Sequence, residues 1–373
     1  MIRRILSRID WYLVGALIPI LGAGLVTMNS FIGQGNQFER QLVWVVIGFA
    51  IFYICSFIDF RFLRRTSVIM TLFGIAVFAL TALFVIGTVA KGAQSWIRLG
   101  LFSIQPSDPA KIVVILLLAK YFSRRHVEIA HFRHIIVSGV YTLIIGGLVL
   151  LQPDFGSALT IFAIWFGMVL VSGISKKHLA IVFAIGLITF GCMWVLVFKQ
   201  YQKDRIINFI HPLANVRGSG YNAYQAMITV GSGEILGKGI GYGTQSRLNF
   251  LPEYETDFIF AAFAEEWGYV GVVILFLLYS IVLWRILSIS MRGETNFEIL
   301  YGTGLSILFM THLTINIGMN IGIMPVTGIP VPFMSYGGSH IVSEFLALGI
   351  LMGMKNYARA MHREVIKNEF VGA

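Results

Sequence analysis

The sequence predicts an all-α polytopic membrane protein that forms a single domain over residues 1–373. Hydrophobic residues make up 57% of the chain, only 12% of its residues are charged, and the mean hydropathy is +0.80. A soluble domain of this length carries far more charge, and long apolar runs are typical of membrane-spanning helices. We identify ten such runs: 11–30, 41–59, 67–87, 109–123, 134–151, 155–173, 178–198, 258–284, 297–322 and 335–354.

Ten spans place both ends of the chain on the same side of the membrane. If that side is cytoplasmic, the inward-facing segments hold eighteen Lys and Arg residues and the outward-facing segments hold ten. Positive residues concentrate in cytoplasmic loops, so the sequence favours an N-in/C-in topology. Contact with anionic lipid then accounts for the net charge of +10, which requires no nucleic acid partner.

The chain begins with a basic segment like that of a signal peptide. The apolar run that follows is long and has no small-x-small cleavage pattern, so we expect an uncleaved anchor. Cys55 and Cys192 lie in different spans and indicate neither a disulfide nor a zinc site.

The two longest loops, at about 88–108 and 199–257, face outward in this topology. Aromatic residues such as Trp96 and Tyr221 alternate with polar ones there, which favours ordered structure over a disordered linker. The glycine-rich run 231–243 matches no nucleotide-binding pattern, and we expect it to allow close backbone packing. The loops are therefore predicted to cap an outer cavity.

The fourth span begins with a charged pair. Asp108 and Lys111 are three residues apart, so they share a helix face and can form an ion pair. This pair is either purely structural or, facing a cavity, a binding site for a diphosphate. Two other polar features have structural interpretations: Asp154 as a turn residue, and His340 with Glu344 as an i, i+4 pair.

The segment 325–339 contains several prolines and glycines and cannot form a regular helix. Irregular backbone is tolerated at membrane depth only where protein or a wet cavity covers it. Together with the outer loops, this segment favours a cavity that opens outward.

The most informative stretch is residues 251–258, where three carboxylates precede an apolar run. Asp257 borders that run directly, and a carboxylate at a membrane edge costs free energy unless water, a cation or a polar partner compensates. A raised pKa there would suit a general base. The alternative is that Asp257 only caps the next helix. Helical periodicity makes Glu265, rather than Glu266, the acid that lines the same cavity.

Seven motifs, in their order and spacing along the chain, resemble the SEDS family (shape, elongation, division and sporulation). They resemble its elongation branch, RodA, more than its division branch, FtsW. The motifs are Lys91–Trp96, Gln105–Lys111, Gln152–Gly156, Gly243–Ser246, Phe250–Glu253, Thr256–Phe260 and Pro332–Gly338.

The resemblance implies a peptidoglycan glycosyltransferase that polymerises lipid II in the bacterial cytoplasmic membrane, with its active site facing outward. The essential aspartate of the family falls on Asp257, and its acid–lysine pair falls on Asp108 and Lys111. The chain departs from the family at Asp108, where Glu is usual, and at Glu255, where His is usual. The extra charge of Glu255 is expected to raise carboxyl pKa values or to favour a bound cation.

The mechanism implied by the resemblance is single-base inversion. Asp257 takes the proton of the acceptor GlcNAc 4-hydroxyl, and undecaprenyl diphosphate leaves. Lys111, Arg98 and Arg205 are candidates for stabilising the leaving group. A divalent cation, Mg²⁺ or Mn²⁺, is a further candidate, although the sequence shows no metal cage. The remaining supporting residues are Trp96, Gln105, Asp108, Asp154, Gln245, Ser246, Glu253, Glu255 and Glu265.

Two other functions stay open at this point: a lipid II flippase and a non-catalytic scaffold of the wall-synthesis complex. A flippase predicts cavity residues in both halves of the membrane, whereas the polar motifs gather in the outer half. The resemblance also implies a class B penicillin-binding protein, a transpeptidase, as partner.

Overall fold

The computed structural model describes residues 9–30, 37–90, 93–99, 102–123, 132–196, 198–211, 220–248 and 250–371, and most of them are helical. The elements are α2 (Trp11–Asn29), α3 (Gln37–Phe57), the 3₁₀ helix η1 (Phe60–Arg64), α4 (Thr66–Ile86), β1 (Thr88–Ala90), β2 (Ala93–Leu99), β3 (Phe102–Ile104), α5 (Ser107–Ser123), α6 (Phe132–Leu151), α7 (Phe155–Val171), α8 (Lys176–Leu196), α9 (Gln200–Ile210), α10 (Tyr221–Ser232), α11 (Thr244–Arg247), α12 (Ile259–Ser290), α13 (Asn296–Asn320) and α14 (Gly338–Val371).

Each of the ten predicted apolar runs coincides with a helix, but not every helix has the length and hydropathy of a full span. Among the described residues, seven helices are long and apolar enough to cross a membrane: α2, α3, α4, α6, α8, α12 and α13. Helices α5 and α7 have 17 residues each, and α5 also begins with the Asp108–Lys111 pair. The chain is a multi-pass membrane protein, and the count of ten spans stays a prediction.

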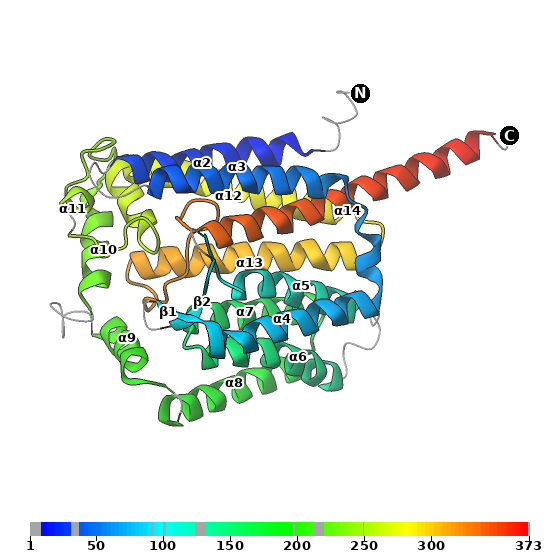
Figure 1. Ribbon diagram of the computed structural model, residues 1–373, viewed down its shortest axis with the longest axis horizontal. Coiled ribbons are helices and arrows are strands. Elements are labelled where there is room, and N and C mark those ends of the chain that lie inside the picture. The colour runs from blue at the N-terminus through cyan, green and yellow to red at the C-terminus, as the bar shows by residue number, and fades with distance from the viewer. Residues whose placement is uncertain are drawn as a thin grey trace.

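Helices distant in sequence lie side by side in the bundle (Figure 1). Helix α14 packs along α3, and α12 packs along α2, while α13 runs through the middle against α5 and α7. Small residues set the closest approach: a Cβ atom at Gly48 would collide with the ring of Phe345, and one at Gly349 would collide with Cys55. The α3–α14 contact therefore depends on glycine at these positions.

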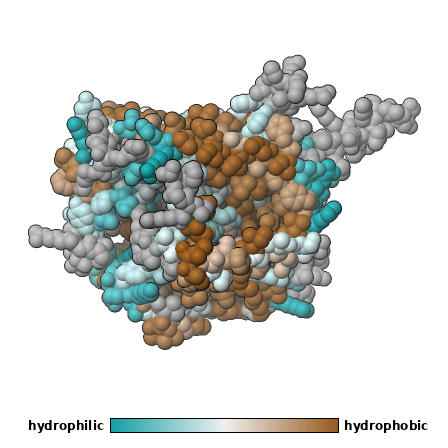
Figure 2. Space-filling model, in the orientation of Figure 1, coloured by the Kyte–Doolittle hydropathy of each residue, from teal (hydrophilic) through white to brown (hydrophobic). Residues whose placement is uncertain are grey.

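The two ends of the bundle differ in character. The strands and helices α9–α11 gather at one end, and α14 extends from the opposite end (Figure 1). Hydrophobic side chains cover the middle of the visible face, whereas hydrophilic ones concentrate toward both ends (Figure 2). This distribution suits a bundle whose waist lies in lipid and whose ends lie in water.

The prediction of an all-α fold is wrong for the first long loop. Strands β1, β2 and β3 form an antiparallel sheet in the order β1-β2-β3, with Thr88 opposite Trp96 and Ile97 opposite Ile104. Pairing between the strands satisfies backbone N–H and C=O groups of this loop. In the second loop, helices α9 and α10 confirm the predicted ordered cap.

The glycine-rich run packs against a break in α12. Gly268 interrupts that helix with a φ angle of 64°, in the left-handed region that favours glycine. The freed carbonyls of Glu265 and Glu266 accept hydrogen bonds from the backbone of Lys238 at 2.9 Å and Gly239 at 3.0 Å. The expected close backbone packing of residues 231–243 is therefore confirmed, and it fixes the first turns of α12.

Candidate active site

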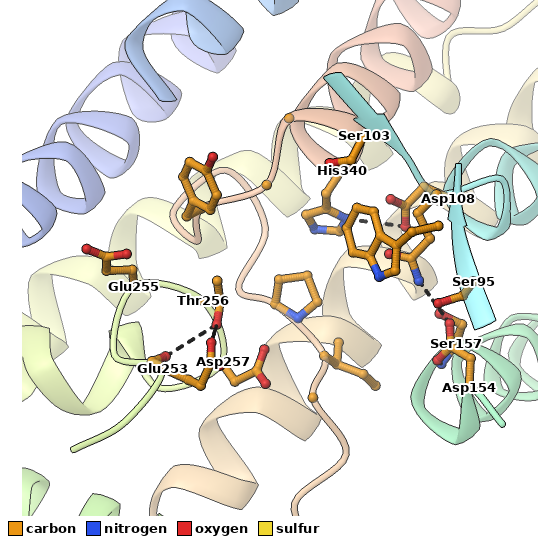
Figure 3. A pocket seen from close by; sticks show the side chains of 18 of the residues that line it. Ser95, Ser103, Asp108, Asp154, Ser157, Glu253, Glu255, Thr256, Asp257 and His340 are labelled. Carbon is orange, nitrogen blue, oxygen red and sulfur yellow. Dashed lines mark hydrogen bonds and ion pairs between the residues drawn. The ribbon is translucent and has the colours of Figure 1, made fainter. Parts of the chain in front are cut away.

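A cavity of about 870 Å³ opens at the end of the bundle that carries the strands and α9. Its walls come from the start of α3, strands β2 and β3, the first turns of α5 and α7, helix α9, the turn 253–257, the irregular segment 327–337 and the first turn of α14. Figure 3 shows that the acidic turn lies on one side of this space and Asp108 with His340 on the other. The cavity therefore unites motifs from the whole length of the chain.

The acidic turn is a tight backbone structure. Glu253 has a φ angle of 55°, and its carbonyl accepts hydrogen bonds from the amides of Thr256 (3.2 Å), Asp257 (3.1 Å) and Phe258 (3.2 Å). Its carboxylate also accepts a hydrogen bond from the Thr256 hydroxyl at 3.0 Å. Glu253 thus shapes the turn that carries Asp257.

Side chains and backbone from distant segments hold the carbonyls of this turn. The amide of Tyr336 donates to Glu255 O at 2.8 Å, and the hydroxyl of Ser335 donates to Thr256 O at 2.7 Å. The carbonyl of Asp257 accepts from Asn316 Nδ2 at 2.9 Å. Three consecutive carbonyls are therefore fixed.

The carboxylate of Asp257 points into the cavity (Figure 3). Helix α12 begins at Ile259 with Phe258 as its N-cap residue, so Asp257 does not occupy the cap position of the structural alternative. The segment of Pro330 passes beside it: a Cβ atom built at Gly328 would lie 3.4 Å from Asp257 Oδ2. Asp257 thus sits on the wall of the cavity.

The opposite wall carries the predicted charged pair. Lys111 Nζ lies 3.1 Å from Asp108 Oδ1, and both side chains are about 95% buried. His340 Nδ1 lies 3.6 Å from the same oxygen, and His340 also lines the cavity. The expected pairing of His340 with Glu344 is present at 2.9 Å. The sequence indicated only a structural role for His340, whereas the structure also places His340 in the cavity wall.

Four further predicted residues line the cavity: Trp96, Gln105, Asp154 and Arg205. Gln105 Nε2 donates to Asp154 Oδ2 at 2.9 Å, which ties the start of α5 to the start of α7. Asp154 Oδ1 accepts from the Ser157 amide at 3.0 Å, so Asp154 caps the start of α7 rather than forming the expected Asx turn. Arg98 pairs with Ser103 on β2–β3, but its side chain lies outside the described residues.

Three predicted residues do not line the cavity: Gln245, Ser246 and Glu265. Glu265 is fully buried and accepts hydrogen bonds from the amide of Gln245 (3.0 Å), from the hydroxyl of Ser246 (3.2 Å) and from Lys238 Nζ (3.0 Å). The prediction assumed that Asp257 and Glu265 share one helical periodicity. It fails because the helix begins only at Ile259, so Asp257 follows the geometry of a turn.

Glu255 lines the cavity and is more than nine-tenths buried. Burial raises the pKa of its carboxyl group above the ordinary value, the charge of Glu253 adds to this, and a hydrogen bond with Tyr254 opposes it. The pKa of Glu255 is thus shifted in the expected direction, but burial and Glu253, rather than the charge of Asp257, are the causes that raise it.

Sequence reasoning missed Asn316 as a residue of the site. Besides binding Asp257, its amide donates to Ile329 O at 2.7 Å, and Asn320 Nδ2 donates to Asn316 Oδ1 at 3.0 Å. Two asparagines four residues apart in an apolar run were the available signal, because amide groups in a span usually have a structural or functional partner.

Comparison with known proteins decides the family. The model of the FtsW/RodA/SpoVE family, described as cell cycle protein, matches residues 6–360. The chain belongs to this family. The FtsW/RodA/SpoVE match covers all the motifs on which the predicted resemblance rests.

Relatives of this FtsW/RodA/SpoVE member include two curated proteins. Peptidoglycan glycosyltransferase MrdB of Escherichia coli strain K12 is 32% identical over 350 residues, which cover 94% of each chain. Stage V sporulation protein E of Bacillus subtilis strain 168 is 32% identical over 356 residues, with 93% of this chain and 96% of that protein covered.

Two solved structures are similar to this FtsW/RodA/SpoVE member. One comes from a peptidoglycan synthase complex that coordinates polymerization and crosslinking. It has a TM-score of 0.81 and 29% identity, covering 94% of this chain and 98% of that one. The other is the rod shape determining protein RodA of Thermus thermophilus, with a TM-score of 0.70 and 27% identity, covering 93% and 96%.

Proposed function

We propose that this protein is a peptidoglycan glycosyltransferase that polymerises lipid II into glycan strands during cell elongation. The observation that carries this proposal is the cavity itself, with the Asp257 carboxylate on one wall and Lys111 on the other. Two relatives whose names or structures concern peptidoglycan synthesis support it. A volume of about 870 Å³ is in the upper range of ligand sites, as sugar substrates require.

Asp257 acts as the general base in this proposal. It accepts the proton of the acceptor GlcNAc 4-hydroxyl, and the hydroxyl oxygen attacks the anomeric carbon of the donor MurNAc. The C–O bond to undecaprenyl diphosphate breaks, the diphosphate leaves with the electron pair, and the configuration inverts from α to β. The fixed carbonyls of Glu255, Thr256 and Asp257 support this role, because they hold the base in one orientation.

Lys111 stabilises the negative charge that develops on the leaving diphosphate. It lies in the cavity wall, and its pairing with Asp108 holds its ammonium group in place. Arg205, on α9, contributes a second positive charge from the rim, and Arg98 is a further candidate. Trp96 and Gln105 help to shape the sugar site.

The active site faces outward in the bacterial cytoplasmic membrane. We infer a single domain over residues 1–373 with ten spans and an N-in/C-in topology, on the basis of the Lys and Arg distribution. The position of the cavity, at the end opposite to the end of α14, supports this topology (Figure 1).

A class B penicillin-binding protein is the proposed partner. The support is the similarity to a synthase complex that coordinates polymerization and crosslinking. Co-purification of the two proteins from membranes tests this partnership, and repeated isolation of the chain without any transpeptidase would contradict it.

The function is tested with purified protein and lipid II, comparing wild type with Asp257→Asn. We expect glycan polymer from the wild type and none from the variant. Equal polymer from both would remove Asp257 from the role of base. Transfer of reporter lipid between leaflets that depends on Asp257, without polymer, would instead favour the flippase.

A further inference from the structure

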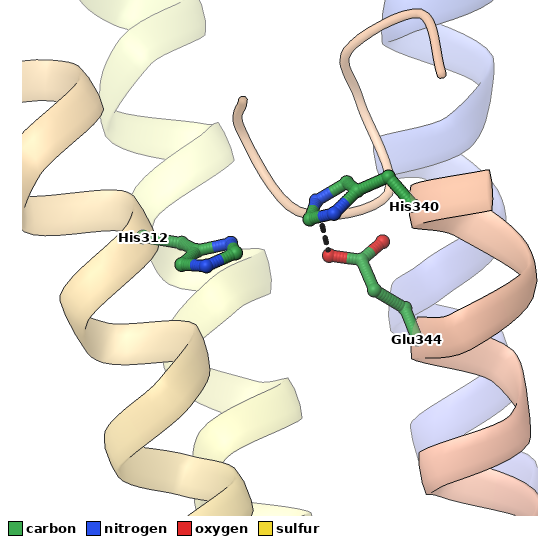
Figure 4. A group of neighbouring side chains, drawn as sticks. All are labelled: His312, His340 and Glu344. Carbon is green, nitrogen blue, oxygen red and sulfur yellow. Dashed lines mark ion pairs between the residues drawn. The ribbon is translucent and has the colours of Figure 1, made fainter. Parts of the chain in front are cut away.

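A second, much smaller cavity lies next to the Asp108–Lys111 pair. Its volume is about 10 Å³, and its lining includes Asp108, Lys111, His312, His340 and Glu344. His312 comes from the middle of α13, and His340 and Glu344 come from the first turns of α14. Figure 4 shows His312 facing His340 across the gap between these helices, with the Glu344 carboxylate beneath the His340 ring.

Three side chains around this cavity converge on one point. One ligand atom from each of His312, His340 and Glu344 lies within 4.8 Å of the others. The three residues expose only 1%, 8% and 4% of their surface. Two imidazoles and one carboxylate are a donor set that binds transition metals.

Several polar atoms of this group lack a hydrogen-bond partner within the described residues. They are both ring nitrogens of His312, His340 Nε2 and Glu344 Oε1. The last two atoms lie 2.9 Å apart, which is an ion-pair distance, but their orientation does not make a hydrogen bond. The His312 and His340 rings are nearly parallel, with centroids 5.2 Å apart, and this contact satisfies neither ring's nitrogens. Buried polar atoms usually have a hydrogen-bond partner, so these four atoms indicate that a ligand binds here.

We propose that His312, His340 and Glu344 form a binding site for a divalent transition-metal ion. Nitrogen ligands favour ions such as Zn²⁺ over Mg²⁺ and Ca²⁺, which prefer oxygen ligands alone. Ligand atoms about 2.1 Å from a tetrahedral ion lie roughly 3.4 Å from one another. Binding therefore needs the most distant pair of ligand atoms to close by at most about 1.4 Å, and His340 Nε2 and Glu344 Oε1 to separate by about 0.5 Å. Three protein ligands leave the fourth position of such an ion open.

The surroundings of the group support a metal site. Asp108 Oδ1 lies 3.6 Å from His340 Nδ1, on the side of the ring opposite to the proposed ion. A carboxylate in that position orients a metal-binding histidine and selects its tautomer. Asp108 also lines the larger cavity, so it links the proposed ion to the wall of that cavity.

The test uses full-length purified protein without a polyhistidine tag. The protein is stripped with a chelator, exposed to Zn²⁺ and freed of unbound metal, after which its metal content and thermal unfolding are measured. We expect about one Zn²⁺ per chain and a higher unfolding temperature, because an ion that binds only the folded state stabilises it. Millimolar Mg²⁺ should not displace it. A wild type that retains no zinc overturns the proposal.

Variants assign the ligands. His312→Ala and Glu344→Gln should each abolish stoichiometric zinc, and Asp108→Asn should weaken its affinity about 10- to 100-fold. His178→Ala, which removes a histidine at the start of α8 far from the group, is the matched control and should bind like wild type. Equal zinc in all variants overturns the assignment.

Cobalt provides a readout that needs no variant to fold. Co²⁺ bound to the wild type should show visible absorption bands of nitrogen and oxygen ligation that disappear when Zn²⁺ is added. Absence of such bands in folded wild type contradicts the proposal. Neither readout depends on polymerisation, so failure of the metal site and failure of the proposed function are distinguishable.

Discussion

Asp257 and Glu265 lie eight residues apart, and their surroundings are opposite. Glu265 is fully buried and accepts hydrogen bonds from five residues of the second outer loop, including Lys238 and Gln245. Asp257 has its backbone carbonyl fixed by Asn316, and its carboxylate lines a large cavity. The difference indicates that Glu265 serves the fold, whereas Asp257 faces the space in which a substrate can bind.

The largest expected effect is the loss of polymerisation activity when Asp257 is changed. Asp257→Asn keeps the shape of the side chain but removes its basicity, so the rate of lipid II polymerisation should fall about 10²- to 10⁴-fold. The unfolding temperature should stay close to that of the wild type. A loss of folding that parallels the loss of activity would give Asp257 the structural role assigned here to Glu265.

A change to the buried Asp108–Lys111 pair should lower both the stability of the fold and the rate of polymerisation. Lys111→Ala leaves Asp108 buried beside an empty position, which should lower the free energy of unfolding by about 3–5 kcal/mol and abolish polymerisation. The double variant Asp108→Asn/Lys111→Met removes both charges and should recover much of the stability in chemical denaturation. Normal polymerisation by this double variant would exclude Lys111 from leaving-group stabilisation.

Glu265→Gln should affect stability more than catalysis. The amide keeps the size of the side chain but loses the charge that binds Lys238 and the loop amides, so the free energy of unfolding should fall by about 1–3 kcal/mol. Thermal unfolding followed by tryptophan fluorescence measures this change. Folded variant protein that has lost its turnover at unchanged stability would contradict the comparison.

The smallest expected effect concerns Glu255 and pH. Its pKa is raised above 4.5 by burial first and then by the charge of Glu253, so its contribution to stability is fully present below pH 4.5 and is lost as pH rises through the folded-state pKa. Glu255→Gln should therefore match the wild type at acid pH and exceed its unfolding temperature at higher pH. A variant that is less stable than the wild type at neutral pH would argue that the charge is compensated.

Much of the candidate site could be predicted from local pattern. The i, i+3 spacing of Asp108 and Lys111 brings them together on any helix, and the motif around Asp257 places it at the start of a span. The prediction that Glu265 lines the cavity was wrong, because the direction of its side chain depends on where α12 begins. Gln245 and Ser246 bind Glu265 away from the cavity. The sheet of strands β1, β2 and β3 was also missed, since hydropathy does not encode the pairing of strands.

By itself, the sequence determined that this is a multi-pass helical membrane protein. It also showed which carboxylates lie at a membrane edge, where their desolvation costs free energy unless a partner or a function compensates. Hydropathy and charge are summed along the chain, so they can be read without knowing the fold. Only the tertiary structure decided that Asn316, Ser335 and Tyr336 fix the acidic turn, and that His312 meets His340 and Glu344. Those contacts join segments far apart in sequence, and their geometry depends on how the helices pack.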